Sequence, residues 1–173
     1  MTDAGWLWLL PAATIVWVLG AYNRLVRLRS RVLQTFVPVD RCLARYAQLI
    51  DEFMGGQKPE AAAWLGLHSA GVQLDNNLRV ARQRALDAAS MAALLSAVST
   101  LQVWWLRLVD EMAQQQPGEA AEAWRAAWAE NSRVAGDAIT LFNDAVVLHN
   151  TAVQQFPAVF VAWLFGFRQA GTL

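Results

Sequence analysis

The sequence predicts an all-α protein, in which an N-terminal transmembrane helix continues into an antiparallel bundle of three to four long helices and a short apolar helix follows. Two observations carry this prediction. An uncharged apolar run opens the 173-residue chain, and apolar residues then recur at steps of three and four through the body. Alanine, leucine, arginine and glutamine, which all favour helices, dominate that body, and no stretch alternates as a half-buried strand does.

The composition limits the classes of function. Hydrophobic residues make up 56% of the chain and charged residues 16%, against a usual charged share of about 25%, so we expect a folded chain rather than a disordered one. The formal net charge is zero, and therefore no basic field would attract nucleic acid. Cys42 is the single cysteine, which rules out an intrachain disulfide and a cysteine zinc cluster.

Residues 1–22 are predicted to form a membrane anchor. The run GWLWLLPAATIVWVLGAY has roughly 18 residues and no charge, which is about the length that crosses the hydrocarbon of a bilayer. A cleaved signal peptide is the alternative, but the segment before the run carries Asp3 without Lys or Arg, and no separate cleavage site of small residues follows. The predicted anchor residues are Trp6, Trp8, Leu10, Ile15, Trp17 and Leu19.

The residues that flank this run predict its orientation. Arg24, Arg27, Arg29 and Arg31 follow the run, whereas only Asp3 is charged before it. Because positive charges next to a transmembrane helix stay on the cytoplasmic side, we expect a single-pass protein with its body in the cytoplasm.

Residues 23–156 are predicted to form the helical bundle. The first apolar seam begins at Tyr22 and ends at Phe53, with a kink expected at Pro38. A break rich in glycine and proline is predicted at residues 55–59.

The rest of the bundle shows three further apolar patterns. A second seam occupies residues 64–88 and a third occupies residues 91–112, out of register with the second. This offset predicts a turn or a kink at residues 87–90. The last long helix is expected to occupy residues 118–156 and to end before Pro157.

Residues 157–173 are predicted to form an apolar C-terminal helix and tail. Its large aromatic residues recur on one helical face, and about twelve apolar residues are too few to span a bilayer. The segment is therefore expected either to cap the membrane-proximal end of the bundle or to lie in the headgroup layer. The predicted membrane-proximal residues are Phe156, Pro157, Phe160, Trp163, Phe165, Gly166 and Phe167.

Short motifs stand near both ends of the chain. YNRLVRLR occupies residues 22–29, and two pairs, Phe142-Asn143 and His149-Asn150, are followed by Phe156-Pro157 and Gly166-Phe167. In these motifs the chain resembles the LemA family of bacterial membrane-anchored helical proteins, although its middle part differs from the family. The resemblance implies an N-terminal anchor in the bacterial inner membrane, an antiparallel helical body and no known catalytic site.

The paired motifs also suggest a contact between the first and last helices. The predicted helix-contact residues are Tyr22, Asn23, Phe142, Asn143, His149 and Asn150. If these two helices are antiparallel, Asn23 and Asn150 lie at about the same height, and we expect their side chains to interact and to fix the register of the bundle.

Residues for catalysis or ligand binding are sparse. The two histidines, His68 and His149, are far apart in sequence and show no His-Glu-x-x-His spacing, and no glycine-rich loop that could hold a phosphate follows a strand. We therefore expect no cofactor and no metal, and no small-molecule substrate can be identified. A packed or capping role is expected for His149.

Two other clusters leave alternatives open. Arg79, Arg82 and Arg84 form either a solvated helix face or a surface for an acidic partner or a lipid headgroup. The tryptophans at 104, 105, 124 and 128 form either part of the core or a protein-contact patch, and at least one of the adjacent pair should lie outside the main seam.

These observations favour a non-enzymatic, membrane-anchored scaffold or adaptor that binds a protein partner or further copies of itself. A membrane-shaping or membrane-sensing homo-oligomer is the alternative. A metal-dependent hydrolase that uses His68 or His149 is a remote third possibility, because no motif supports it. The expected partners are the lipid bilayer and protein, without nucleic acid.

Overall fold

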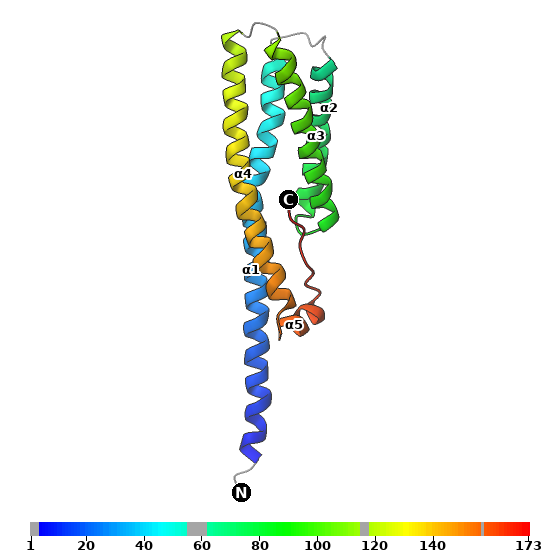
Figure 1. The fold of residues 1–173 in the computed structure, drawn as a ribbon. Helices are drawn as coiled ribbons and strands as arrows, with labels where there is room; N and C mark the ends of the chain where they lie inside the picture. The colour runs from blue at the N-terminus through cyan, green and yellow to red at the C-terminus, as the bar shows by residue number, and fades with distance from the viewer. Residues whose placement is uncertain (1–3, 55–61, 115–117, 157) are drawn as a thin grey trace.

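The computed structural model describes residues 4–54, 62–114, 118–156 and 158–173 (Figure 1). In these ranges the chain forms five helices, α1 (Ala4–Met54), α2 (Ala62–Gln83), α3 (Ala88–Ala113), α4 (Glu119–Gln154) and α5 (Ala158–Phe165). The described residues contain no strand, so the predicted all-α class is confirmed. The break expected at residues 55–59 lies outside the described residues.

The four long helices alternate in direction along the chain (Figure 1). α1 packs along α4, α2 packs along α3, and α1 also contacts α2. The α1–α4 pair is longer than the α2–α3 hairpin, and α5 lies beside this pair below the hairpin (Figure 1). The N-terminal part of α1 continues beyond α5 without a neighbouring helix (Figure 1).

The predicted seam of α1 forms one side of the core. Its residues Leu25, Val32, Phe36, Val39, Leu43, Tyr46 and Ile50 are all buried. α1 also contains Pro11 and Pro38 within one continuous helix, so Pro38, where a kink is expected, does not end it. Pro38 and Gln34 are exposed, and the carbonyl group of Gln34 that proline leaves without a donor can therefore bind water.

The turn between α2 and α3 lies earlier than the sequence predicts. α2 ends at Gln83, and α3 begins at Ala88 after Asp87, whose Oδ2 accepts hydrogen bonds of 2.8 Å from the backbone N and the Oγ of Ser90. The second seam therefore does not continue as one helix to Ala88, which is exposed on the first turn of α3. An aspartate at the N-cap of α3 favours this reversal, because its carboxylate satisfies free amide groups of the first turn.

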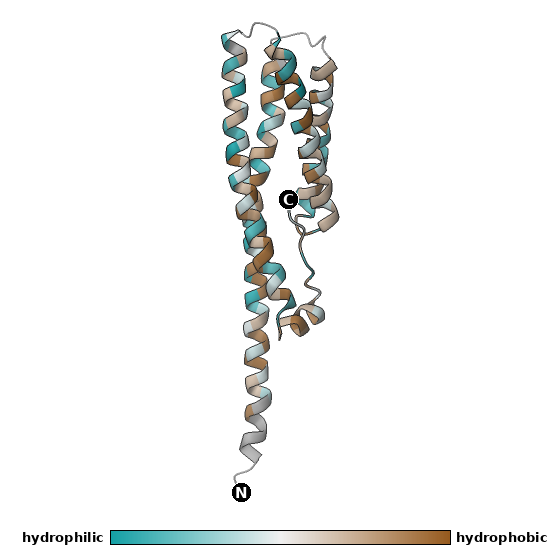
Figure 2. Ribbon diagram, in the orientation of Figure 1, coloured by the Kyte–Doolittle hydropathy of each residue, from teal (hydrophilic) through white to brown (hydrophobic). Residues whose placement is uncertain are grey.

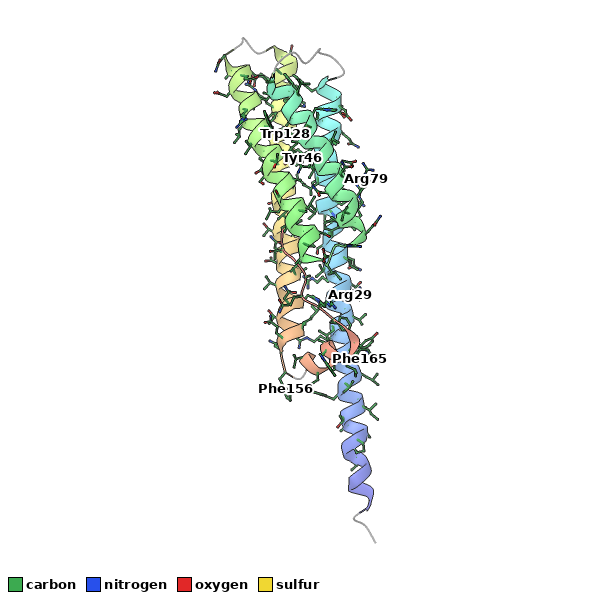
Figure 3. The ribbon with its side chains drawn as sticks, turned by 90° about the vertical axis from the view of Figure 1, so that its right-hand side faces the viewer. Arg29, Tyr46, Arg79, Trp128, Phe156 and Phe165 are labelled. Atoms are coloured by element: carbon green, nitrogen blue, oxygen red, sulfur yellow. The ribbon has the colours of Figure 1, made fainter. Side chains whose placement is uncertain are left out.

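Large aromatic side chains fill the end of the bundle away from α5. Trp105 stacks on Trp128 with ring centroids 4.2 Å apart, and Phe53 stacks on Trp124 at 4.3 Å. Tyr46 packs on Trp128 at 4.7 Å, and Figure 3 shows these two side chains together in the upper part of the molecule. α3 reaches α4 through these indole rings.

The four tryptophans therefore lie in the core or pack against it rather than forming an exposed patch. Trp124 and Trp128 are buried, and Trp124 Nε1 donates a hydrogen bond of 2.8 Å to the carbonyl oxygen of Leu49. Trp104 is half-buried, and the guanidinium of Arg107 lies 4.8 Å from the centre of its ring. Trp105 is half-buried as well, so both members of the adjacent pair lie at the edge of the core.

Candidate functional site

The first turns of α1 carry exposed apolar side chains. Leu9, Ile15, Val16, Trp17 and Leu19 are all exposed in the isolated chain. The side chains of Trp6, Trp8 and Leu10 lie outside the described residues. Monomeric soluble proteins rarely expose a contiguous apolar surface of this extent.

A second exposed apolar surface lies on α5. Its small residues Ala158, Val161 and Ala162 are buried against Leu25 of α1 and Val153 of α4. Its large residues face outward: Trp163 is 83% exposed and Phe160 is 64% exposed, and Phe165 is exposed as well. Figure 2 shows α5 largely in the colour of hydrophobic residues. α5 therefore packs on the bundle through its small residues, and its large aromatic residues do not cap the bundle.

Aromatic contacts join these two surfaces. The ring of Tyr22 on α1 lies 4.8 Å from that of Phe165 and 6.0 Å from that of Phe167, and Trp17 lies 6.5 Å from Phe156. Figure 3 shows Phe156 and Phe165 at the lower end of the bundle beside α1. Pro157 lies outside the described residues. The apolar start of α1 and the outer face of α5 thus form one continuous end of the molecule.

The helix α5 ends at a glycine. Gly166 has a φ of 70°, and the N–H of Phe167 donates a hydrogen bond of 2.9 Å to the carbonyl oxygen of Ala162. This is the Schellman arrangement, which favours glycine because a side chain is strained in the left-handed region. The predicted helix therefore stops before Phe167, and residues 166–173, which we call the C-terminal tail, turn back along α4 (Figure 1).

Two asparagines of α4 hold this tail by its backbone. The side chain of Asn150 donates a hydrogen bond of 2.9 Å to the carbonyl oxygen of Ala170, and its Oδ1 accepts one of 2.8 Å from the N–H of Ala170. Asn143 makes the same pair with Leu173, at 2.6 and 2.9 Å. Each carboxamide therefore binds the tail as a neighbouring strand would bind it.

The spacing of the two pairs explains why they fit. Seven residues of helix separate Asn143 from Asn150 and span about 10.5 Å. Three residues of extended chain separate Ala170 from Leu173 and span about 10 Å. The repeat of the asparagines on the helix thus matches the repeat of the extended tail, and we call Asn143 and Asn150 the tail clamp.

The tail also meets α3. A Cβ atom placed on Gly171 would lie 2.6 Å from the Cα of Ala88, so only a glycine permits this approach. Ala170 is buried, and Leu173 packs against the main core. The tail consequently joins α4 to the start of α3. Among the described residues, the backbones of these two helices do not approach each other closely.

The structure places the predicted helix-contact residues in different surroundings. Phe142 is buried and packs edge-on against Phe36 of α1 at 5.7 Å. Asn150 binds Ala170 instead of Asn23, and Asn23 is exposed, so the predicted pairing of the two asparagines is wrong. The sequence pattern could not reveal the tail as the partner, because its extended path leaves no helical period.

Other polar contacts between α1 and α4 were not predicted. Tyr46 Oη donates a hydrogen bond of 2.9 Å to Ser132 Oγ, and Asn131 Nδ2 donates one of 3.0 Å to the carbonyl oxygen of Cys42. Burial raises the pKa of the Tyr46 hydroxyl, against the opposing effect of Ser132. Burial also raises the pKa of the Cys42 thiol, which makes this cysteine a poor nucleophile.

The predicted basic cluster is largely engaged with carboxylates of the chain. Arg79 lies 2.7 Å from Asp75 on its own helix, and Arg82 lies 2.7 Å from Asp40 on α1. Arg84 is exposed in the turn after α2. These contacts favour the interpretation of the cluster as a solvated helix face. Exposed ion pairs of this kind typically contribute little to stability.

Comparisons with known proteins add no assignment: no family model, no curated protein and no solved structure matches this chain. The resemblance to the LemA family therefore stays a prediction. Within the described ranges, no group of three or more His, Cys, Asp and Glu side chains could hold a metal ion.

One described helix, α3, is long and apolar enough to cross a membrane by length and composition. Its buried side chains, among them Met91, Leu94 and Leu101, form part of the main core. A core helix of a bundle passes the same test, so this property does not separate a spanning helix from a packed one.

Proposed function

We propose that this chain is a non-enzymatic, membrane-anchored scaffold or adaptor, whose bundle binds a protein partner or further copies of itself. The observation that carries the proposal is the continuous apolar end of the molecule, where the exposed start of α1 meets the exposed aromatic face of α5. An anchor in the bilayer would cover the first surface. The headgroup layer would take up the second, because tryptophan and phenylalanine on a short helix favour that depth.

The charges beside this end support the same placement. Arg24, Arg27, Arg29 and Arg31 follow the apolar segment directly and are exposed on α1. Arginines at this position interact favourably with anionic headgroups on the cytoplasmic side. In this proposal the bundle stands in the cytoplasm, with the α2–α3 hairpin held away from the bilayer by the longer α1–α4 pair.

Exposed apolar side chains on the body support the scaffold role. Val134, Leu141 and Leu148 recur every seven residues on α4, and Val26 and Leu33 do so on α1, all outside the core. A spacing of seven places side chains on one stripe of a helix, which is the pattern through which helices associate. These stripes are the surfaces that a protein partner or a second copy would cover.

The anchor is tested with the full chain. We expect it to remain in the membrane fraction after an alkaline wash, whereas Ile15→Asp, which places a charge in the apolar segment, should shift it to the soluble or aggregated fraction. Val72→Asp, at an exposed position on α2, is the matched control and should leave the distribution unchanged. Release of the unaltered chain by the wash would contradict the anchor.

The scaffold role is tested by crosslinking in membranes, with Leu141→Arg as the interface variant. A crosslinked heterologous protein that is lost with Leu141→Arg and kept with Val72→Arg supports an adaptor. Crosslinks between copies with the same dependence support self-association. If Leu141→Arg abolished neither kind of crosslink, the exposed stripe on α4 would not be the interface.

Membrane shaping is a second candidate, favoured by the exposed aromatic face of α5 beside the anchor. A shallow apolar helix displaces headgroups and favours curved bilayers. Electron microscopy of liposomes that contain the full chain would show tubulation if this role is correct, and Trp163→Ser together with Phe160→Ser should abolish it. Spherical liposomes at high protein density would contradict it.

A further inference from the structure

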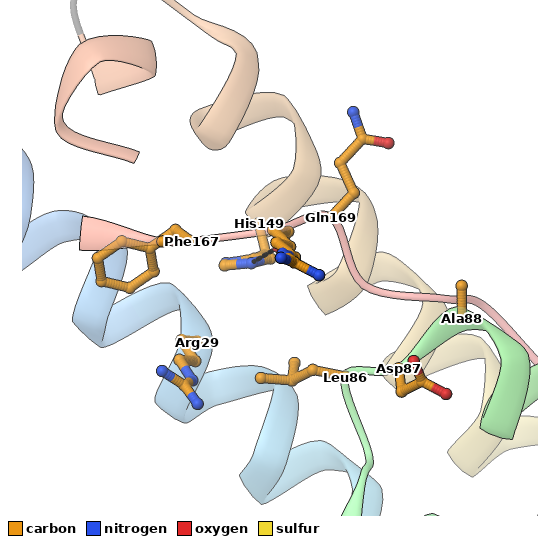
Figure 4. Close-up of a pocket in the computed structure, with 9 residues that line it drawn as sticks. Arg29, Leu86, Asp87, Ala88, His149, Phe167 and Gln169 are labelled. Atoms are coloured by element: carbon orange, nitrogen blue, oxygen red, sulfur yellow. Dashed lines mark hydrogen bonds between the residues drawn. The ribbon is translucent and has the colours of Figure 1, made fainter. Parts of the chain in front are cut away.

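A cavity of about 350 Å³ lies where the C-terminal tail crosses the lower end of the α2–α3 hairpin. Figure 4 shows His149 of α4 near its centre, Arg29 of α1 on one side, and Leu86 and Asp87 of the α2–α3 turn on another. Residues 166–169 of the tail close it. Its volume is in the range of small-molecule sites.

His149 gives this cavity an unused polar group. The side chain is 1% exposed. Its Nε2 lies 3.2 Å from the carbonyl oxygen of Arg168, and because a carbonyl oxygen can only accept, Nε2 carries a proton and donates it. Nδ1 is buried and has no hydrogen-bond partner in the described part of the chain. A buried nitrogen without a partner is unfavourable, and a group bound in this cavity would supply the missing hydrogen bond.

The charged side chains around His149 determine the kind of ligand. Arg29 from α1 and Arg168 from the tail line the cavity, and neither forms an ion pair with any residue that the structure describes. Asp87 is the acidic side chain of the lining, and its Oδ2 already accepts two hydrogen bonds from Ser90. Two guanidinium groups against one carboxylate give the lining a net positive charge.

We propose that this cavity binds a phosphate monoester. Guanidinium groups form paired, charge-assisted hydrogen bonds with phosphate oxygens, and Nδ1 of His149 would accept a further hydrogen bond from a phosphate hydroxyl while Nε2 keeps its bond to Arg168. The phosphate belongs either to a lipid headgroup, such as that of phosphatidic acid, or to a small soluble molecule. The inference goes beyond the scaffold role and does not depend on it.

Binding is measured on the full chain in nanodiscs. For the soluble source, inorganic phosphate and glycerol 1-phosphate are titrated into nanodiscs of phosphatidylcholine. For the lipid source, the same nanodiscs are prepared with phosphatidic acid and the bound lipid is counted by native mass spectrometry. We expect saturable binding of one phosphate per chain in at least one arm.

The variants separate the cavity from the general charge of α1. Arg29→Gln should weaken binding about tenfold or more, because it removes a charge-assisted contact. Arg31→Gln removes an exposed arginine of the same helix that does not line the cavity, and it should change binding less than twofold. An equal effect of the two substitutions would overturn the proposal, since it would indicate attraction of anions by the helix surface alone.

The two histidines of the chain provide an independent readout by NMR of their ring nitrogens. A phosphate hydroxyl that donates a hydrogen bond to Nδ1 changes the surroundings of that nitrogen, so saturating ligand should shift the Nδ1 resonance of His149. His68, exposed on α2, serves as the internal reference and should not change. Absence of saturable binding in both arms, or an unchanged His149, would overturn the proposal.

Discussion

Each asparagine of the tail clamp supplies two hydrogen bonds to one residue of the tail. Asn150→Ala removes both bonds to Ala170 and leaves buried backbone groups without partners. We expect the free energy of unfolding to fall by about 1–3 kcal/mol. Asn23→Ala, at an exposed position of α1, is the matched control and should change it by less than about 0.5 kcal/mol.

Chemical denaturation of the full chain in detergent micelles measures both changes. The double variant Asn143→Ala with Asn150→Ala should lose less than the sum of the single variants, because both residues hold the same tail. Equal stability of Asn150→Ala and Asn23→Ala would show that the tail is not bound as described.

Asp87 makes the stability of the α2–α3 turn dependent on pH. Hydrogen bonds from the side chain and the backbone of Ser90 lower the pKa of its carboxyl group. The stabilisation is therefore complete above the ordinary carboxyl pKa of about 3.9 and is lost as the pH falls through the lower native value.

We expect Asp87→Ala to lower the melting temperature at neutral pH, and the difference from the unaltered chain to shrink as the pH falls below about 4. Asp110→Ala, at an exposed aspartate near the end of the same helix, is the control. A difference that stays constant down to the lowest pH at which the chain remains folded would contradict the role of the Asp87 carboxylate.

The close packing of α2 on α3 depends on a residue without a side chain. A Cβ at Gly66 of α2 would overlap the indole ring of Trp104 on α3, whereas Gly136 of α4 has open space around it. Gly66→Ala should therefore destabilise the chain by about 1–3 kcal/mol through overpacking. Gly136→Ala should stabilise it by about 0.4–1 kcal/mol, because alanine restricts the unfolded chain.

Thermal unfolding followed by circular dichroism compares the two variants directly. We expect the two changes in stability to have opposite signs. Both substitutions replace glycine by alanine inside a helix, so the difference reports the surroundings of each glycine. Stabilisation by Gly66→Ala would mean that Trp104 moves away easily and that the contact between α2 and α3 does not depend on it.

The two ends of the molecule should respond differently to the loss of a tryptophan. Trp128 is 2% exposed in the aromatic cluster of the bundle, and Trp163 is 83% exposed on α5. Trp128→Ala should lower the free energy of unfolding by about 3–5 kcal/mol without weakening the association of α5 with lipid. Trp163→Ala should change the stability by less than about 0.5 kcal/mol.

Quenching of tryptophan fluorescence by brominated lipids measures the second property. Trp163→Ala should remove part of the quenching, and Trp128→Ala should leave the quenched fraction intact. If Trp163→Ala left quenching unchanged, the outer face of α5 would not lie in the headgroup layer.

The helical class and the core of α1 follow from the sequence by itself. Apolar residues at steps of three and four bring one face of a helix together, and burial of that face is the main source of its stability. Val32, Val39 and Leu43 are therefore buried as predicted. The end of α5 at Phe165 was not predicted, although it depends on a local property, because Gly166 permits a conformation that other residues avoid.

Only the tertiary structure determined the partner of the asparagines and the surroundings of His149. The tail is extended and is held by its backbone, so no periodicity of its side chains connects it with α4. Asn150 meets Ala170, and Arg29 lines the same cavity as Arg168, because the chain reverses direction between α1 and the tail. Such contacts between distant segments depend on the packing of whole helices, which a pattern within one segment does not contain.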